Sequence, residues 1–161
     1  MRVLYWGPRR MPETDERELA MTYVDFDAVF RESDFVSVHA PLRADTRHLV
    51  GERELALMKP TTFLINTARG AVIEEAALVR ALADRRIAGA GLDVFEHEPW
   101  VSPELLAMRN VVLVPHLGSA VRELREQMAN IVVDNIAAML CGRVPPNCVN
   151  PEVLEKQTSA K

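Results

Sequence analysis

Short apolar runs alternate with helix-like stretches along the whole chain. The apolar runs are too short for helices, and several lack polar alternation, which indicates strands buried on both faces of a parallel sheet. We expect strands at 2–6, 22–24, 35–39, 62–65, 89–94 and 111–114. Apolar spacing predicts helices at 14–20, 26–32, 51–57, 74–84 and 103–107, and a long helix over 119–141.

This strand–helix alternation predicts an α/β fold, a doubly wound parallel sheet built from right-handed crossovers. One domain is expected over residues 1–142, ending with the long helix that Gly142 stops, and a C-terminal tail over 143–161. Residues 73–82 and 131–140 have helical apolar spacing, so we expect both stretches to face the core.

Composition narrows the class of protein. Of the 161 residues, 48% are hydrophobic and 26% are charged, which is typical of a globular domain. The net charge of −4 argues against a nucleic-acid partner, since phosphate binding needs a basic surface. No long apolar run or signal peptide is visible, so we expect a cytoplasmic protein with no membrane partner. Cys141 and Cys148 form no metal-binding or disulfide pattern, so no metal is expected.

Chemically useful side chains follow three of the predicted strands. Ligands bind at the carboxyl ends of the strands in a doubly wound sheet, and Arg69, Glu98 and His116 follow the fourth, fifth and sixth strands. Taken singly, Arg69 could be an ordinary surface charge, Glu98 part of a solvated acidic loop, and His116 a structural histidine. Together on one sheet edge, they form an acid–base pair beside a group that can bind a carboxylate.

Three segments around these residues resemble one enzyme family. NTARG at 66–70, AGAGLDVFEHEP at 88–99 and VPHLGSA at 114–120 resemble the D-2-hydroxyacid dehydrogenases, most closely the glyoxylate and hydroxypyruvate reductase branch. VSVHAPL, TRHLV and VPPNCVN extend the likeness over nearly the whole chain. The resemblance implies that residues 1–142 form part of a Rossmann dinucleotide-binding domain.

The resemblance also assigns roles to the three side chains. It implies reduction of a small 2-oxoacid, glyoxylate or hydroxypyruvate, to the D-2-hydroxyacid with NAD(P)H. Arg69 matches the arginine that binds substrate, and its planar guanidinium suits a carboxylate. His116 matches the general acid that protonates the forming alkoxide. Glu98 matches the glutamate beside it, and a carboxylate bonded to the ring favours the protonated imidazole and fixes its orientation.

The cofactor contacts follow from the same resemblance. It places Asp93 near the nicotinamide and implies further contacts from Pro41, Thr46, Thr67, Ala68 and Gly118. MRVLYW matches the strand whose end carries an acidic residue in NAD-binding domains, and Gly7 occupies that position. Pro8, Arg9 and Arg10 follow, so the missing carboxylate and the two guanidiniums favour NADP over NAD.

Two parts of such an enzyme are not found in the sequence. No GxGxxG turn occurs in the 161 residues, and the separate substrate domain has no counterpart. The chain is therefore the C-terminal part of a reductase, a truncated and inactive binding module, or a relative of NAD(H)-sensing corepressors. We expect no measurable turnover from the isolated chain, and a homodimer in the full-length parent. Loss of the first strand and its helix predicts an exposed inner sheet edge and apolar face.

Overall fold

The computed structural model describes residues 1–152. The strands are β1 (Val3–Tyr5), β2 (Met21–Tyr23), β3 (Phe35–Val38), β4 (Phe63–Asn66), β5 (Gly89–Leu92) and β6 (Val111–Leu113). The helices are α1 (Glu13–Glu18), α2 (Phe26–Glu32), α3 (Glu52–Leu57), α4 (Glu75–Ala83), α5 (Pro103–Ala107) and α6 (Arg122–Leu140), with a 3₁₀ turn η1 (Gly70–Val72). Each predicted strand and helix is therefore confirmed, with small shifts at the ends.

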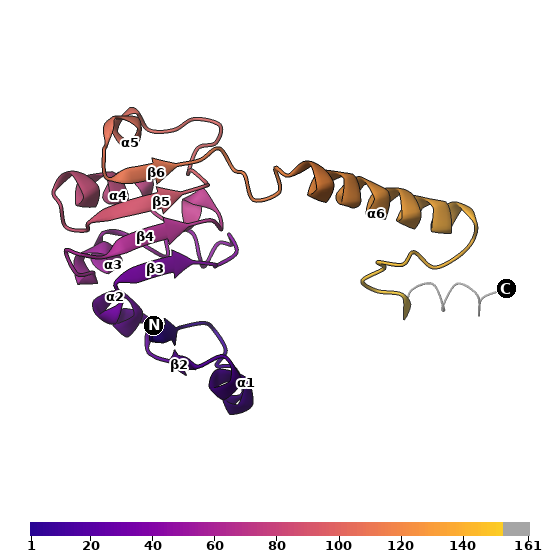
Figure 1. Cartoon of the computed structure of the whole chain (residues 1–161), viewed down its shortest axis with the longest axis horizontal. Helices are drawn as coiled ribbons and strands as arrows, with labels where there is room; N and C mark the ends of the chain where they lie inside the picture. Colours follow the sequence, from indigo (N-terminus) through magenta and orange to yellow (C-terminus); the bar gives the residue numbers. More distant parts are fainter. Residues whose placement is uncertain (153–161) are drawn as a thin grey trace. The chain divides into compact units, whose positions relative to one another are not determined.

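All described strands run parallel, but their hydrogen bonds form two sheets. β1 pairs with β2, and β3, β4, β5 and β6 form a second sheet in that order (Figure 1). The α/β class and the Rossmann-like alternation are confirmed, whereas the expected single sheet is divided between β1 and β3. Among the described residues, β1 pairs only with β2, and β3 pairs only with β4. Each therefore has one edge without a partner, which agrees with the predicted exposed edge.

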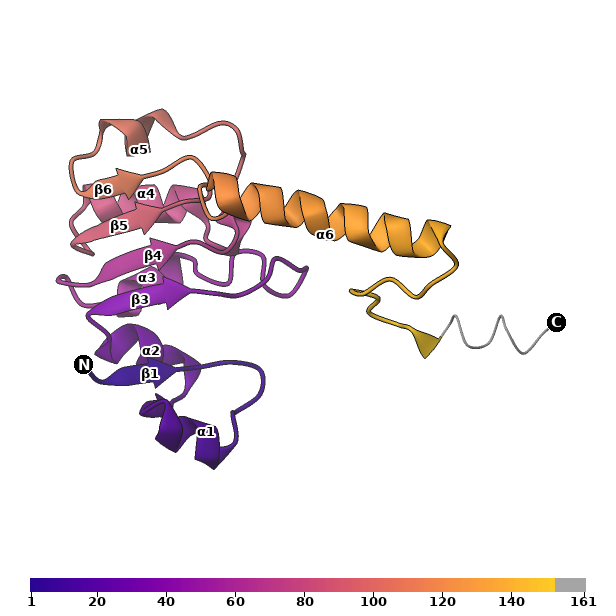
Figure 2. The same ribbon diagram turned by 45° about the vertical axis from the view of Figure 1, so that its right-hand side comes forward.

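The core lies between the four-stranded sheet and the helices that cover one of its faces. α3 and α4 lie against the same face of this sheet in both Figure 1 and Figure 2. The buried side chains include Val36, Leu64 and Leu92 from the strands and Leu55 and Leu78 from the helices. Residues 73–82 contribute to this core as their spacing predicts.

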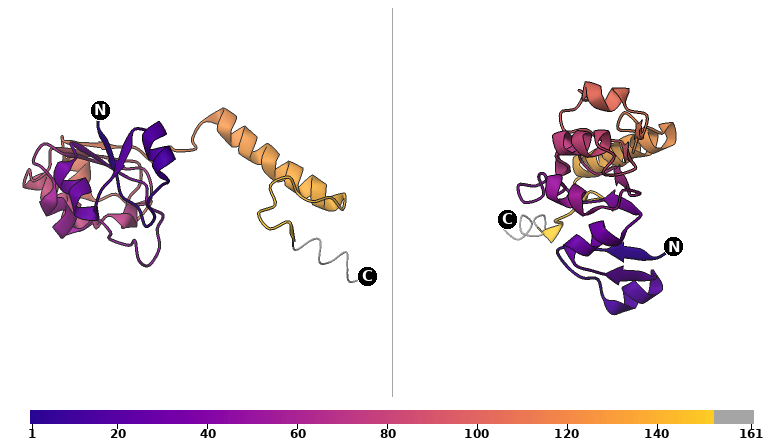
Figure 3. Two further views of the ribbon diagram at one scale, coloured as in Figure 1. Left: turned by 90° about the horizontal axis from the view of Figure 1, so that it is seen from below. Right: turned by 90° about the vertical axis from the view of Figure 1, so that its left-hand side faces the viewer.

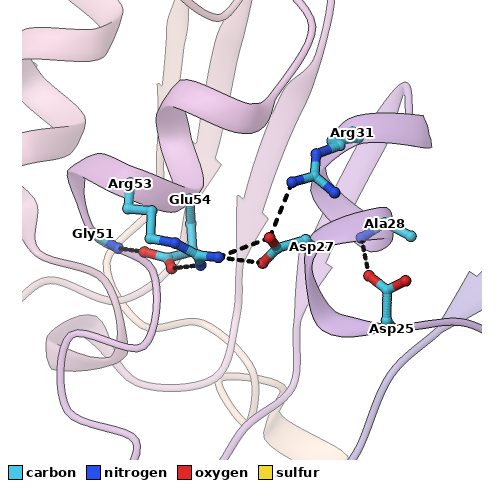
Figure 4. Close-up of polar contacts among 7 residues, drawn as sticks. All are labelled: Asp25, Asp27, Ala28, Arg31, Gly51, Arg53 and Glu54. Atoms are coloured by element: carbon cyan, nitrogen blue, oxygen red, sulfur yellow. Dashed lines mark hydrogen bonds and ion pairs between the residues drawn. The ribbon is translucent and has the colours of Figure 1, made fainter.

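A charged network joins α2 to α3 on the outside of the domain (Figure 4). Arg53 Nη2 donates to both carboxylate oxygens of Asp27 at 2.7 Å, and Arg31 donates to the same carboxylate at 3.1 Å. Asp25 caps the start of α2 by accepting from the Ala28 amide, and Glu54 in the first turn of α3 accepts from the amide of the capping residue Gly51. The bonds between Arg53 and Asp27 hold α3 against α2, and the other bonds stabilise each helix separately.

Two predicted burial patterns are wrong. Several strands were expected to be buried on both faces, but in β3 Phe35 is 65% exposed and in β4 Phe63 is 41% exposed. Their rings stack on the sheet face opposite the helices, with centroids 5.7 Å apart. Residues 131–140 are also largely exposed, with Ala138 the buried exception. Apolar spacing predicts which face of a helix or strand can be buried. It does not show whether another element covers that face.

The chain divides into two compact units, and the second unit begins at Leu117. The first contains both sheets and ends with His116, and the second contains α6 (Figure 3). α6 begins at Arg122 and not at residue 119, because Val121 has an extended backbone with φ −108°. A domain boundary at residue 142 stays a prediction. None of the described helices combines the length and apolar character that a membrane crossing requires.

Candidate active site

The turn after β4 holds Arg69 through its own hydrogen bonds. The buried Asn66 side chain donates to the Arg69 carbonyl and accepts from the Ala68 amide, each at 3.0 Å. Arg69 itself is exposed, and its Nη1 donates to the Ala68 carbonyl at 2.6 Å. Asn66 therefore sets the conformation of the NTARG turn, while the guanidinium stays at the surface where a ligand could reach it.

Gly70 lets this turn pack directly on the loop after β5. A Cβ at Gly70 would lie 1.9 Å from the carbonyl carbon and oxygen of Phe95, a distance that no side chain can occupy. Glycine is required here by space and not by φ. This close approach brings the segment that carries Arg69 against the segment that carries Glu98.

Glu98 links the loop after β5 to the histidine after β6. Its Oε1 accepts from the Phe95 amide at 3.1 Å, and its Oε2 lies 3.0 Å from Nδ1 of His116. The peptide bond from Glu98 to Pro99 is cis. Glu98 and His116, which lie on two strand-end loops, are thus in direct contact, and their acid–base role stays a prediction.

The electrostatics of the pair follow from this contact. The hydrogen bond from His116 is the main cause that lowers the pKa of Glu98, against the opposing effect of burial. The positive charge of Arg69 lowers the same pKa, so Arg69 lies close enough to act on this carboxylate. Glu98 is therefore held ionised beside an imidazole and near a guanidinium.

His116 has an unusual backbone conformation. Its φ is +53°, in the left-handed region that non-glycine residues seldom adopt, and its amide donates to the Val114 carbonyl at 3.1 Å. Such a conformation is costly and persists where the surroundings impose it, often at functional sites. Here it turns the chain sharply just after β6 and places the ring beside Glu98.

Glu96 has no role assigned from the sequence, but the structure shows it to be a central hydrogen-bond acceptor. Its carboxylate is only 8% exposed and accepts from His48 at 2.6 Å and from Arg47 and the Glu75 amide at 3.0 Å each. The Glu75 carboxylate accepts in return from the Glu96 amide at 3.0 Å. The TRHLV loop, the start of α4 and the loop that carries Glu98 are joined at this point.

The pKa of Glu96 reflects the same contacts. Burial is the largest single influence and raises it, yet hydrogen bonds from His48 and Glu75 outweigh burial, so the pKa is lowered. No short motif marked Glu96, because its histidine partner is 48 residues away in sequence. The buried, ionised carboxylate braces the loop two residues before Glu98.

The remaining predicted cofactor contacts differ in accessibility. Thr46 is buried, and its hydroxyl donates to the Pro41 carbonyl and accepts from the Arg43 amide, so this side chain organises its own loop. Asp93 is buried at the end of β5, and its amide donates to the Asn66 carbonyl at 3.0 Å. A cofactor role for these residues, and for Pro41, Thr67, Ala68 and Gly118, stays a prediction.

The loop after β1 lies at the far end of the expected cofactor site. Gly7, Pro8, Arg9 and Arg10 connect β1 to α1, and both arginines are exposed. A Cβ at Gly7 would contact only the Arg9 carbonyl oxygen, at 3.6 Å, so this position has open space beside it. Arg10 is bound to Glu16 through two hydrogen bonds of 2.8 Å each. The two arginines predicted to act alike therefore have different surroundings.

Comparison with known proteins defines the class. Residues 1–118 match the model of the NAD-binding domain of D-isomer specific 2-hydroxyacid dehydrogenases. The chain belongs to this family, and the resemblance seen in its motifs is confirmed. It is 52% identical over 154 residues to the glyoxylate reductase of Thermococcus litoralis. The aligned region covers 96% of this chain and 46% of that reductase.

Two solved structures show the same fold with different cofactors. The D-lactate dehydrogenase of Lactobacillus jensenii with NAD⁺ has a TM-score of 0.80 and 33% identity, covering 90% of this chain and 47% of that one. The NADPH-dependent glyoxylate/hydroxypyruvate reductase of Sinorhizobium meliloti, in complex with NADP and malonate, has a TM-score of 0.74 and 39% identity, covering 85% and 41%. The chain spans about half the length of the curated relatives it matches.

Proposed function

We propose that this chain supplies the nucleotide-binding and acid–base half of an NADPH-dependent reductase that converts glyoxylate or hydroxypyruvate to the D-2-hydroxyacid. The observation that carries the proposal is the 3.0 Å contact between Glu98 and Nδ1 of His116, beside Arg69. A cytoplasmic location and a homodimer of the complete enzyme are part of the proposal. The corepressor alternative gains no support from a particular residue, and we do not propose it.

The side chains divide the reaction between them. Arg69 binds the carboxylate of the 2-oxoacid and orients the neighbouring carbonyl. A nicotinamide held at this site would supply the hydride that the carbonyl carbon accepts. Because Nδ1 of His116 is bonded to Glu98, Nε2 is the nitrogen that transfers a proton to the developing alkoxide. The carbonyl becomes an alcohol, His116 becomes neutral, and solvent restores its proton.

Glu98 acts on His116 and not on the substrate. An ionised carboxylate bonded to Nδ1 stabilises the imidazolium that reduction requires and holds the ring in one orientation. The lowered pKa of Glu98 keeps this carboxylate charged at neutral pH, with the bond to His116 as its main cause. His116 is therefore held beside a charged carboxylate at neutral pH.

The preference for NADPH rests on the loop after β1. Gly7 replaces the carboxylate that would accept from a ribose 2′-hydroxyl and would repel a 2′-phosphate. Open space beside Gly7 and an exposed guanidinium at Arg9 suit a phosphate at this position. The described loops offer groups for the adenosine and nicotinamide ends, and no GxGxxG turn for the pyrophosphate occurs in the sequence.

A chimeric reductase tests the proposal. This chain replaces its matched segment in the Thermococcus litoralis glyoxylate reductase, and oxidation of NADPH by glyoxylate is followed by absorbance. We expect turnover, a lower Michaelis constant for NADPH than for NADH, and a loss in kcat of about 100-fold or more in His116→Asn. His97→Asn is the matched control. A folded chimera without turnover, or with full turnover in His116→Asn, contradicts the proposal.

The isolated chain is assayed beside the chimera. We expect it to show no measurable turnover, since the pyrophosphate turn and substrate domain are not found in its sequence. Robust turnover by the isolated chain would show that these parts are not needed.

A further inference from the structure

A buried carboxylate controls one of the two arginines in the loop after β1. Glu16 on α1 is only 8% exposed, and its two oxygens accept from Arg10 Nε and Nη2 at 2.8 Å each. The Tyr5 hydroxyl donates to the same carboxylate at 2.7 Å. A bidentate pair of this kind holds the guanidinium in one plane and neutralises its charge.

The ionised state of the carboxylate is secure. The hydrogen bond from Arg10 is the main cause, followed by the bond from Tyr5, that lowers the pKa of Glu16 to about 2. The charge of Glu16 is therefore present throughout the physiological pH range. To an approaching phosphate, Arg10 and Glu16 together carry no net charge.

Tyrosines fix the rest of the loop. The Tyr5 hydroxyl accepts from the Met11 amide at 2.8 Å, and the Tyr23 hydroxyl donates to the Gly7 carbonyl at 3.3 Å. The Arg10 guanidinium carbon lies 5.9 Å from the centre of the Tyr23 ring. These bonds hold the loop between β1 and α1 at its beginning and at its end, and Arg10 contributes to them through Glu16.

Arg9 differs from its neighbour. It is exposed, and within residues 1–152 no hydrogen bond or ion pair involves its guanidinium. It lies two residues past Gly7, where the space beside the backbone is open. Arg9 therefore carries the uncompensated positive charge of this loop.

We infer that Arg9 selects for the cofactor's 2′-phosphate, whereas Arg10 is a positioning residue that Glu16 and Tyr5 hold to shape the loop. This inference rests on the NADPH preference proposed above. It separates two adjacent arginines that the sequence makes equivalent.

Two small probes test the inference on the full chain. Adenosine 2′,5′-bisphosphate carries the phosphate in question, and adenosine 5′-monophosphate lacks it. Binding of each is measured by isothermal titration calorimetry, and the ratio of the two affinities reports selection for the 2′-phosphate. We expect the wild-type chain to prefer the bisphosphate by about tenfold or more, the effect of one charge-assisted hydrogen bond.

The arginine variants should separate the two roles. Arg9→Ala should abolish the preference and leave the affinity for the monophosphate unchanged. Arg10→Met should weaken both probes by the same factor, because the loop loses its shape while Arg9 remains. A loss confined to the bisphosphate in Arg10→Met would overturn the assignment by showing direct contact. Equal binding of both probes to Arg10→Met and wild type would overturn the positioning role.

A third variant controls for the possibility that Arg10→Met misfolds. Glu16→Gln keeps the shape and most hydrogen bonds of the pair but removes the negative charge. Its bisphosphate preference should equal or exceed that of the wild type, because Arg10 is no longer neutralised. A tenfold fall in preference would overturn the inference. No preference, or no binding, in the wild-type chain would instead overturn the NADPH proposal on which the inference rests.

Discussion

Oε2 of Glu98 lies 3.0 Å from Nδ1 of His116, although 18 residues separate the two in sequence. The contact joins the loops that follow β5 and β6, which are adjacent strands of the same sheet. Parallel pairing places the carboxyl ends of these strands together, so the sheet itself sets the distance between carboxylate and imidazole.

Glu98→Gln in the chimeric reductase should change the pH dependence of kcat/KM for glyoxylate. The hydrogen bond from His116 lowers the pKa of Glu98, so the wild-type carboxylate stays charged at neutral pH and is protonated only as the pH falls through that lowered value. Glutamine carries no charge at any pH, so the rate should be lower at neutral pH, and the decline that protonation of Glu98 causes on acidification should be absent. Steady-state rates across the pH range measure the difference. Glu104→Gln, a carboxylate on α5 bonded to Ser102, serves as the control and should leave the profile unchanged.

Arg69→Lys should weaken the use of substrate more than it changes the fold. Lysine keeps the charge but loses the planar pair of donors that suits a carboxylate, so kcat/KM for glyoxylate should fall by about 100-fold. The chimeric reductase gives the kinetics, and thermal unfolding should be unchanged. Arg109→Lys, another exposed arginine, should leave both intact. Unaltered kinetics in Arg69→Lys would remove Arg69 from the substrate site.

The sequence predicted the elements and the three catalytic candidates for a clear physical reason. Strand and helix periods are local, and the end of each strand marks the edge at which ligands bind. Arg69, Glu98 and His116 could thus be grouped without knowing any distance. The contact between Gly70 and Phe95 could not be foreseen, because it depends on how closely two separate loops approach.

Charge pairing was also beyond local patterns. Arg9 and Arg10 have the same side chain and are adjacent, yet only Arg10 meets the buried Glu16. The exposure of Phe35 and Phe63 likewise depends on which element covers their face of the sheet. The sequence of an apolar strand does not identify that element. Propensity thus gives the elements, whereas packing decides which side chains are free.

Glu96→Ala should destabilise the first unit by about 1 kcal/mol, since it leaves the part-buried Glu75 amide without its acceptor and removes the bonds from His48 and Arg47. The lowered pKa of Glu96 gives a pH signature: its contribution is present above the ordinary carboxyl pKa and is lost as pH falls through the lowered value. The wild type should therefore lose stability on acidification more steeply than the variant.

Denaturant unfolding of the isolated chain at several pH values measures this difference. Glu18→Ala, an exposed residue of α1, is the matched control and should stay within about 0.5 kcal/mol of wild type. Equal stability of Glu96→Ala and wild type at neutral pH would show that the bonds to His48 and Glu75 contribute nothing measurable.

The isolated chain should self-associate through the open side of its four-stranded sheet. The stacked rings of Phe35 and Phe63 are exposed there, and β3 has one edge without a partner among the described strands. Apolar surface beside an open edge favours contact with another chain. Size-exclusion chromatography with light scattering should therefore give a mass above that of the monomer, rising with protein concentration.

Phe35→Asp should shift this equilibrium toward the monomer, because association would bury an unpaired carboxylate against apolar surface. Leu106→Asp on α5 is the matched control: Leu106 is also 65% exposed, but it lies on a helix away from the open edge. A monomeric wild type at all concentrations would contradict the prediction. If both aspartates reduced association equally, the contact could not be assigned to β3, since general surface hydrophobicity would then explain the association.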